Sequence, residues 1–512
     1  MKTSSDALFR LIKAMTKGEK KHFKKMTSSF ASSKSSTNYI KLFDAISKLS
    51  EYDEEALLKK FRREAFVKNF VETKQYLKIK ILKALRSYSA NKSILFQLRE
   101  DLLDIEILMQ KEVFDLAKTQ IKKSLKVARK YELTPYIFEL NELQFKIAMV
   151  LQDSKTIEIY ATETILEEEV GVKKIEHIRY YWHRYVRMFH SWKKHGPIQQ
   201  EKDITNFEDY PLDSFNAGHF HFMRELCIGQ VFNDAETFYK DALSYYQLFK
   251  KYPEQIDLNP LNYIISIELY TNACAKANHI EEGLLIAQEG IYFLERMVLE
   301  EKLVPKNSVN HLISLHNSQL RLYLHHGSKP LFKQSYLSFK QLVLKHVGVA
   351  ILSNKTGVLG AILISEVILE EWDVAEISYQ RIVDNKTQGH RNDIESIMRL
   401  LGVIIYYETN NEVLLEVLVD ATYQFLRTKD SLFKFTRQFI NFFKHKIINA
   451  LNEEEQIKHL KQFRTESLAF FEKNPEECNV LIYFDFIAWM DSKIENGSIH
   501  EAYCKRLHAN IN

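Results

Sequence analysis

From about residue 94 to the end of the chain, apolar residues recur every three or four positions. Because an α-helix has 3.6 residues per turn, this spacing gathers them on one side of a helix. Period-2 runs, which would indicate strands, do not occur in the sequence, so we expect no strands. The clearest stripes are Phe114, Ala117, Ile121, Leu125 and Ala128, then Ala235, Phe238, Ala242, Tyr245 and Phe249, and then Ile280, Leu284, Ala287, Ile291, Leu294 and Val298.

The breaks between the expected helices come in pairs. The first helix of each pair is predicted to begin near residues 95, 136, 173, 214, 261, 308, 351, 391, 431 and 476. These starts are roughly 37–47 residues apart, which is the range of two-helix solenoid repeats. The sequence therefore predicts an all-α fold in which residues 93–512 form a solenoid of stacked helix pairs.

The second helix of several pairs opens in a similar way, with an apolar anchor and acidic residues before a small residue. The segments are Val113–Ala117, Val231–Ala235, His279–Gly283 and Trp372–Ala375. With the first-helix segment Tyr270–Ala273, they resemble tetratricopeptide-type repeats, although the units are longer than the roughly 34 residues of that family. The resemblance covers residues 94–510 and implies a right-handed helix-hairpin solenoid whose first helices line a groove.

Residues 1–92 are predicted to form a separate, basic N-terminal helical domain, called the head below. Thr16 and Glu19 fit a capping box at a helix start, and residues 28–36 are serine-rich and indicate a loop. Three helices are expected over residues 39–49, 53–63 and 66–88, an order compatible with a helix-turn-helix. Leu11-Ile12-Lys13, followed by Thr16-Lys17-Gly18-Glu19-Lys20, resembles the opening of an uncharacterised bacterial helical-repeat family, which implies no particular activity.

Composition supports the helical prediction. The 512 residues include 14 Gly and 8 Pro, far below the roughly 7% and 5% of typical proteins. This shortage argues against β-sandwiches, propellers and glycine-loop nucleotide enzymes, which need both residues for turns. We expect a cytoplasmic protein, because no signal peptide or membrane-spanning stretch is visible and the four cysteines are far apart, at Cys227, Cys274, Cys478 and Cys504.

Motifs of catalysis are missing from the sequence, which contains no GxSxG, Walker, GxGxxG or HExxH pattern. We therefore expect a protein that is not an enzyme and has no cofactor. His500, Cys504 and His508 recur every four residues and could share a zinc ion on one helix face. A fourth ligand is missing, so an ordinary helix face is the preferred interpretation and no metal site is predicted.

The expected function is that of a non-catalytic scaffold that binds a protein or peptide partner in the solenoid groove. Polar residues within the first helices are the candidate contacts, because mid-helix Asn is unfavourable for the helix itself and its amide can bond an extended peptide. These partner-groove candidates are Asn262, Asn272, Asn310, Asn317 and Arg321. The sequence leaves the oligomeric state open.

The alternative is a regulatory protein that binds nucleic acid through its head. Residues 1–90 contain 21 Lys and Arg against nine Asp and Glu, and clustered cations release counterions from phosphates. The candidate contacts are Lys17, Lys20, Lys21, Lys24 and Lys25, and the helix expected over 66–88 would lie in a major groove. We expect no membrane binding, because the first helix has no Trp anchor.

Overall fold

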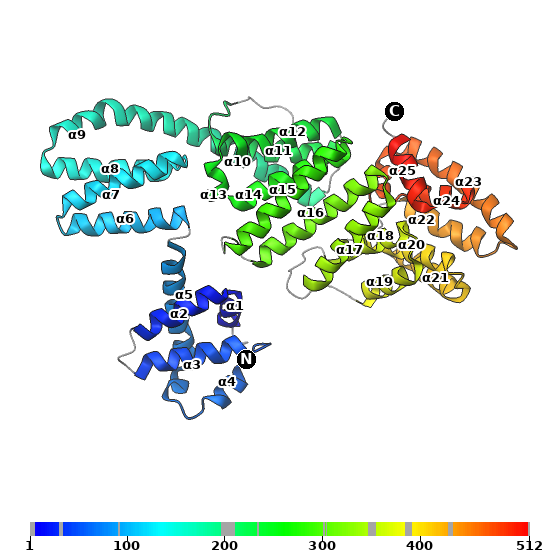
Figure 1. The fold of residues 1–512 in the computed structure, drawn as a ribbon, viewed down its shortest axis with the longest axis horizontal. Coiled ribbons are helices and arrows are strands. Elements are labelled where there is room, and N and C mark those ends of the chain that lie inside the picture. The colour runs from blue at the N-terminus through cyan, green and yellow to red at the C-terminus, as the bar shows by residue number, and fades with distance from the viewer. Residues whose placement is uncertain are drawn as a thin grey trace. The chain divides into compact units, whose positions relative to one another are not determined.

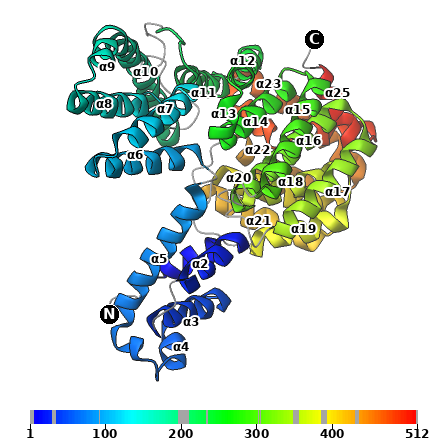
Figure 2. The same ribbon diagram turned by 60° about the vertical axis from the view of Figure 1, so that its left-hand side comes forward.

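A computed structural model of the chain describes residues 6–29, 34–90, 93–195, 210–232, 235–300, 303, 305–346, 355–384, 392–428 and 434–509. Within these ranges every regular element is a helix and no strand is present (Figures 1 and 2). The all-α prediction is therefore confirmed. None of the described helices is both long enough and apolar enough to cross a membrane.

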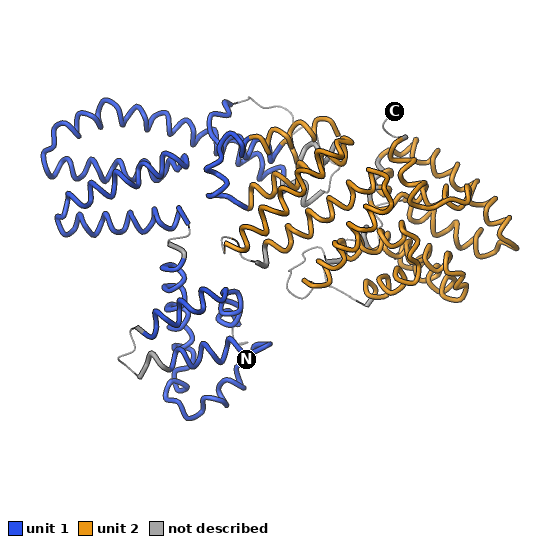
Figure 3. The backbone as a smooth tube through the Cα atoms, viewed as in Figure 1, with its two compact units in different colours: residues 1–224, 248–260 blue, residues 225–247, 261–512 orange. Residues whose placement is uncertain are grey.

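The chain divides into two compact units (Figure 3). Unit 1 comprises residues 1–224 and 248–260, and unit 2 comprises residues 225–247 and 261–512. Residue 92, after which the sequence places a domain boundary, belongs to unit 1 and lies outside the described residues.

The head, at the start of unit 1, is a cluster of helices around its own buried core, which includes Phe23, Phe43, Leu77 and Ile81. The three helices expected after residue 39 are present, and the third is preceded by a 3-10 turn. The loop expected over residues 28–36 is shorter than predicted, because helices reach Ser29 and resume at Lys34. The head elements are α1 (Ala7–Ala14), α2 (Lys17–Ser29), α3 (Lys34–Lys48), α4 (Glu54–Lys60), η1 (Ala65–Asn69) and α5 (Phe70–Ala90).

The predicted capping box at the start of α2 is confirmed. The backbone N–H of Thr16 donates to the Glu19 carboxylate over 2.7 Å, and the N–H of Glu19 donates to the Thr16 hydroxyl over 3.2 Å. These reciprocal bonds satisfy two amides that have no partner within the helix.

The rest of unit 1 continues as helices that pack in chain order. The helix start predicted near residue 173 is wrong, because one helix runs from Ser154 to His195 through a π turn. Gly171 lies inside this helix, where a Cβ would come within 2.8 Å of the Phe138 ring. The elements are α6 (Ile94–Gln110), α7 (Phe114–Lys130), α8 (Thr134–Leu151), α9 (Ser154–Ile159), η2 (Tyr160–Thr164), α10 (Ile165–His195), the first part of α11 (Phe215–Phe232) and α13 (Glu254–Leu258).

Unit 2 is a succession of helices that also pack on their sequence neighbours. This order is consistent with a solenoid of helix pairs. The elements are α12 (Ala235–Lys251), which begins in it, α14 (Pro260–Lys276), α15 (Ile280–Leu299), α16 (Pro305–His326), α17 (Lys329–His346), α18 (Lys355–Ile368), α19 (Trp372–Asp384), α20 (Asn392–Glu408), α21 (Glu412–Thr428), α22 (Lys434–Phe442), η4 (Phe443–Ile447), α23 (Glu453–Lys473), η5 (Pro475–Ile482), α24 (Phe486–Glu495) and α25 (Ile499–Ala509).

Helix starts agree well with the apolar pattern. Those predicted near residues 95, 136, 214, 261 and 308 lie within three residues of the starts of α6, α8, α11, α14 and α16. The starts predicted near 351, 391 and 431 fall outside the described residues. Near residue 476 the chain forms the 3-10 helix η5, and the next α-helix begins only at Phe486.

A single kind of turn joins many consecutive helices. A residue with positive φ is followed by an N–H that donates five residues back to a carbonyl of the preceding helix, for example from Val113 to Leu108 over 2.9 Å and from Asn411 to Tyr406 over 3.0 Å. This is a Schellman ending, whose left-handed position usually holds Gly. Here the position is occupied by Glu112, Glu132, Gln152, Asn278, Glu370, Asn410 and Asn496, which explains how the chain turns so often with few glycines.

The C-terminal helices fold back onto earlier first helices. Besides its partner α24, α25 packs against α16 and α18. The indole N–H of the fully buried Trp489 in α24 donates to Glu408 of α20 over 2.8 Å. Because each repeat of an open solenoid contacts only its neighbours, the α16–α25 part of unit 2 departs from that pattern by closing on itself.

Candidate partner-binding surface

Helices α14 and α16 of unit 2 are joined by two polar side-chain contacts. His311 of α16 lies 3.2 Å from the carboxylate of Glu268, and the hydroxyl of Ser318 donates to the Asn272 amide oxygen over 2.8 Å. Burial lowers the pKa of His311, but the hydrogen bond and the charge of Glu268 outweigh it, so the net pKa is raised. Both contacts pair a polar group with its complement, so they stabilise the packing of the two helices.

One turn further along, the same two helices bring two cations together. Lys276 follows Asn272 by four residues and Arg321 follows Ser318 by three. Each cation therefore lies one helical turn beyond the Asn272–Ser318 contact, on the same side of its helix. Within the described part of the chain, neither cation has a carboxylate within ion-pair distance. The ammonium of Lys276 lies 5.1 Å from the ring centre of the buried Phe238, which holds its position.

The two cations are accessible to solvent but surrounded by protein. Both side chains are exposed, yet burial is the largest cause that lowers the pKa of Lys276 and of Arg321, and the charge of Arg321 lowers the pKa of Lys276 further. Two like charges there favour an anionic group from outside.

The other predicted groove residues lie on the same first helices and are half-buried: Asn262, Asn310 and Asn317. Asn317 precedes Arg321 by four residues and shares its side of α16. The Asn272 amide oxygen accepts the bond from Ser318 and so contributes to helix packing. Lys276 was not predicted, because its proximity to Arg321 depends on the offset between two helices about 45 residues apart in sequence.

The C-terminal helix borders this surface but gathers no metal ligands. The Cys504 thiol donates to the carbonyl of Leu324 over 3.4 Å and lies 3.8 Å from the His500 ring, whereas the His508 ring is 3.2 Å from the carbonyl of His325. Burial raises the pKa of Cys504 to about 11, which disfavours the thiolate that zinc needs. The described residues contain no group of three side chains placed to hold a metal ion.

Tyrosines bound to glutamates connect α12, α14 and α15. Glu282 accepts hydrogen bonds from Tyr239 of α12, over 2.8 Å, and from Tyr270 of α14. Glu289, two turns later, accepts from Tyr246 of α12, over 2.7 Å, and from Tyr263 of α14. Sequence reasoning missed this arrangement, although its signal is a seven-residue spacing in all three helices. Because the bonds are used within the fold, we assign the tyrosines a structural role.

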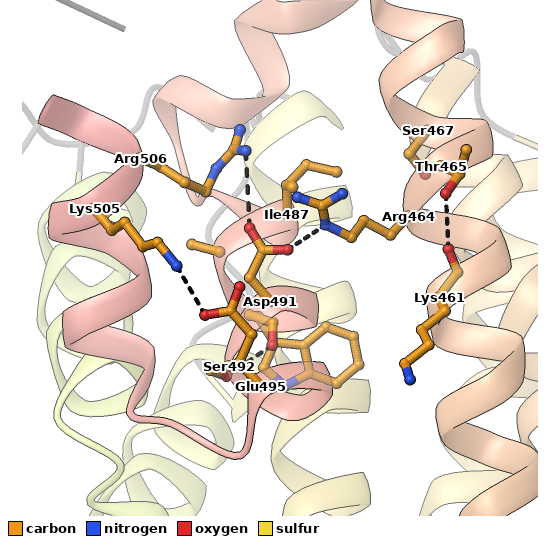
Figure 4. Close-up of polar contacts among 12 residues, drawn as sticks. Lys461, Arg464, Thr465, Ser467, Ile487, Asp491, Ser492, Glu495, Lys505 and Arg506 are labelled. Carbon is orange, nitrogen blue, oxygen red and sulfur yellow. Dashed lines mark hydrogen bonds and ion pairs between the residues drawn. The ribbon is translucent and has the colours of Figure 1, made fainter. Parts of the chain in front are cut away.

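An ionic network joins the last three α-helices (Figure 4). Asp491 of α24 pairs with Arg464 of α23 and lies 4.0 Å from Arg506 of α25. Arg506 also pairs with Asp485 over 2.7 Å. Two cations and two anions balance here, so the network links helices and leaves little net charge for a ligand. By contrast, the pair of Lys505 and Glu495 in the same view is exposed.

In the head, the predicted nucleic-acid contacts are divided between two environments. Lys21, Lys24 and Lys25 are exposed, and Lys24 pairs with Asp44 of α3 over 2.6 Å. Lys17 is exposed as well, whereas Lys20 is half-buried, and burial, followed by the charge of Lys13, lowers the pKa of Lys20. Phe23, which lies among these lysines in sequence, is fully buried in the head core and so is not available to stack on a base.

Comparisons with protein-family models, with curated proteins and with solved structures found no match.

Proposed function

We propose that this protein is a non-catalytic scaffold whose unit 2 binds an acidic peptide segment of a partner protein. The observation that carries the proposal is the adjacent pair of exposed cations, Lys276 and Arg321, on the first helices α14 and α16. A carboxylate placed between them would relieve their mutual repulsion and would accept bonds from the guanidinium fork. The amide of Asn317 would bond the backbone of the same segment.

Peptide binding in solution tests this proposal. Fluorescence anisotropy would compare labelled acidic ten-residue peptides with the same peptides in which Gln replaces Glu and Asp. We expect only the acidic set to bind, and Arg321→Gln to raise the Kd at least tenfold, because a hydrogen bond to a charged group contributes roughly 1.5–3 kcal/mol. Asn317→Ala should weaken the same complex, because its amide would bond the peptide backbone.

The matched control is Arg296→Gln, which removes an exposed arginine of the second helix α15. Its Kd should equal that of the wild type. Equal binding of acidic and neutral peptides, or equal losses in Arg321→Gln and Arg296→Gln, would remove the proposal.

Nucleic-acid binding by the head is the second candidate, and the closeness of Lys13 and Lys20 favours it. After burial, the charge of Lys13 lowers the pKa of Lys20, and such crowding of positive charge is expected of a surface that attracts phosphates. Mobility-shift affinity should fall steeply with salt and disappear in the variant Lys20→Gln, Lys21→Gln, Lys24→Gln and Lys25→Gln. A flat salt response would exclude this candidate.

A further inference from the structure

Helix α5 of unit 1 has apolar side chains on two opposite faces. Leu77 and Ile81 are buried in the head core. On the other side, Val71, Ile79 and Leu82 are 73%, 51% and 41% exposed, and their spacing aligns them along one seam. A helix that is apolar on both sides is suited to being covered on both sides, and the head covers only one.

The exposed seam of α5 has basic edges. At 100° per residue, Lys78 and Lys83 lie on either side of it, Arg86 follows Leu82 by four residues, and all three are exposed. Glu72 is the one acidic residue in the sequence of α5. Nucleic-acid phosphates would contact the cations but would leave the apolar seam uncovered. A protein groove with an apolar floor and acidic edges would satisfy both.

Such a groove lies between α6 and α8 of the same unit. It is a hollow of about 490 Å³, with Leu102, Leu103, Pro135 and Tyr136 as its apolar lining and with carboxylates supplied by Glu106 and Glu139. Its one lining cation is Arg99, whose guanidinium lies 6.0 Å from the ring centre of Phe96.

Around this groove, α6 is apolar and acidic. Leu103 and Ile107 are 59% and 53% exposed, and Glu100 and Asp104 are exposed beside them. The surface is therefore complementary to α5 in both properties: apolar seam to apolar seam, and carboxylates to amines.

We propose that α5 of a second copy of this chain occupies the α6–α8 groove. Each copy carries both the helix and the groove, so two copies related by a two-fold axis form two identical contacts and a closed dimer. The exposed apolar residues of α5 lie on the groove floor, and Lys78 and Lys83 face Glu106 and Glu139. This dimer is independent of peptide binding by unit 2.

Sedimentation equilibrium of the full chain tests the dimer. We expect reversible dimerisation, with a Kd that rises at least tenfold in Ile79→Ser combined with Leu82→Ser, because both lose apolar contact. Both residues are exposed, so the fold should tolerate the change. The matched control is Leu285→Ser, which replaces a more exposed leucine (73%) of α15 in unit 2 and should leave the Kd unchanged.

Charge reversal identifies the two surfaces. Lys78→Glu with Lys83→Glu, and separately Glu106→Lys with Glu139→Lys, should each give a monomer, because like charges then meet at both contacts. An equimolar mixture of the two variants should dimerise again, since every contact in the mixed pair joins opposite charges.

Three results would overturn the proposal: a wild-type chain that stays monomeric at all concentrations, variants that dimerise like the wild type, or a mixture of monomers that does not associate. Circular dichroism of each variant shows whether it is folded, so that loss of the dimer is not confused with loss of structure.

Discussion

Asp491 illustrates how much of the packing of unit 2 depends on single polar side chains. Its carboxylate lies among the guanidinium groups of Arg464 and Arg506 and is largely shielded from water (Figure 4). Removing its charge would leave the guanidinium of Arg464 without this partner in a partly buried place, whereas Arg506 keeps Asp485. An unpaired cation in such a place costs more than the pair contributes when intact.

We expect Asp491→Asn to lower the free energy of unfolding by about 2 kcal/mol, below the 3–5 kcal/mol of a fully buried pair because Arg464 is partly exposed. Glu495→Gln, which breaks an exposed pair on the same helix, should change it by no more than about 0.5 kcal/mol. Urea unfolding measures both. Equal decreases in the free energy of unfolding for the two variants would show that burial of the network does not increase its contribution to stability.

A buried glycine of α20 gives a second prediction. A Cβ at Gly402 would come within 2.8 Å of the hydroxyl of Tyr379, which is itself buried. Gly402→Ala should therefore lower stability by about 2 kcal/mol through overpacking. In Gly360→Ala the new Cβ would meet the flexible side chain of Met398 at 3.1 Å, and the roughly 1 kcal/mol gain in helix propensity should offset the contact. Thermal unfolding of the two variants separates the effects.

At the scale of the element, the recurring Schellman turn sets where helices end. Its left-handed residue is under strain when it is not Gly, because its Cβ then comes too close to the following carbonyl oxygen. This strain costs roughly 1–2 kcal/mol. Asn tolerates this conformation better than Glu does. Each of these turns therefore makes the folded state less stable than the same turn with Gly would.

Glu112→Gly should for this reason stabilise unit 1 by about 0.5–1 kcal/mol, since Glu112 has a φ of 57° and an exposed side chain. Glu100→Gly, in the middle of α6, should destabilise it by about 1 kcal/mol. Differential scanning calorimetry would show opposite shifts of Tm. Destabilisation by Glu112→Gly would contradict this prediction, because it would mean that the exposed Glu112 carboxylate stabilises the fold.

The elements were predictable because a helix depends on local spacing. The stripe of Phe238, Ala242, Tyr245 and Phe249 is buried as its period predicts. The π turn after α9 was not predictable, because its residues continue a helical pattern. The candidate site was predictable only in part: Arg321 could be named from its helix, whereas Lys276 requires the register between two helices, which is set by contacts distant in sequence.

At the scale of the whole molecule, both units contain a histidine that folding keeps neutral. Burial lowers the pKa of His219 in unit 1 to about 4. Burial, followed by the charges of Arg321 and His508, lowers the pKa of His325 in unit 2 to about 4. The unfolded chain binds the proton at about 6.5. The stability from these residues is therefore complete above about pH 6.5 and is lost as the pH falls through about 4.

We expect the Tm of the protein to decrease between pH 6.5 and 4, and His325→Gln to reduce that dependence because Gln does not titrate. The control is His326→Gln, which replaces the exposed neighbour and should leave the slope unchanged. Thermal unfolding over this pH range provides the measurement, and identical slopes for the two variants would contradict the assignment to His325.

The return of α25 onto α16 also matters for how the chain is made. The core of the α16–α25 part of unit 2 is one continuous cluster with members from Val309 to Cys504, and the bond from Cys504 to Leu324 spans 180 residues. During synthesis on the ribosome, α16 emerges long before the helix that covers it, and contacts of such long range form slowly. We therefore expect the growing polypeptide to expose apolar surface until α25 has emerged from the ribosome, and to depend on chaperones during that interval.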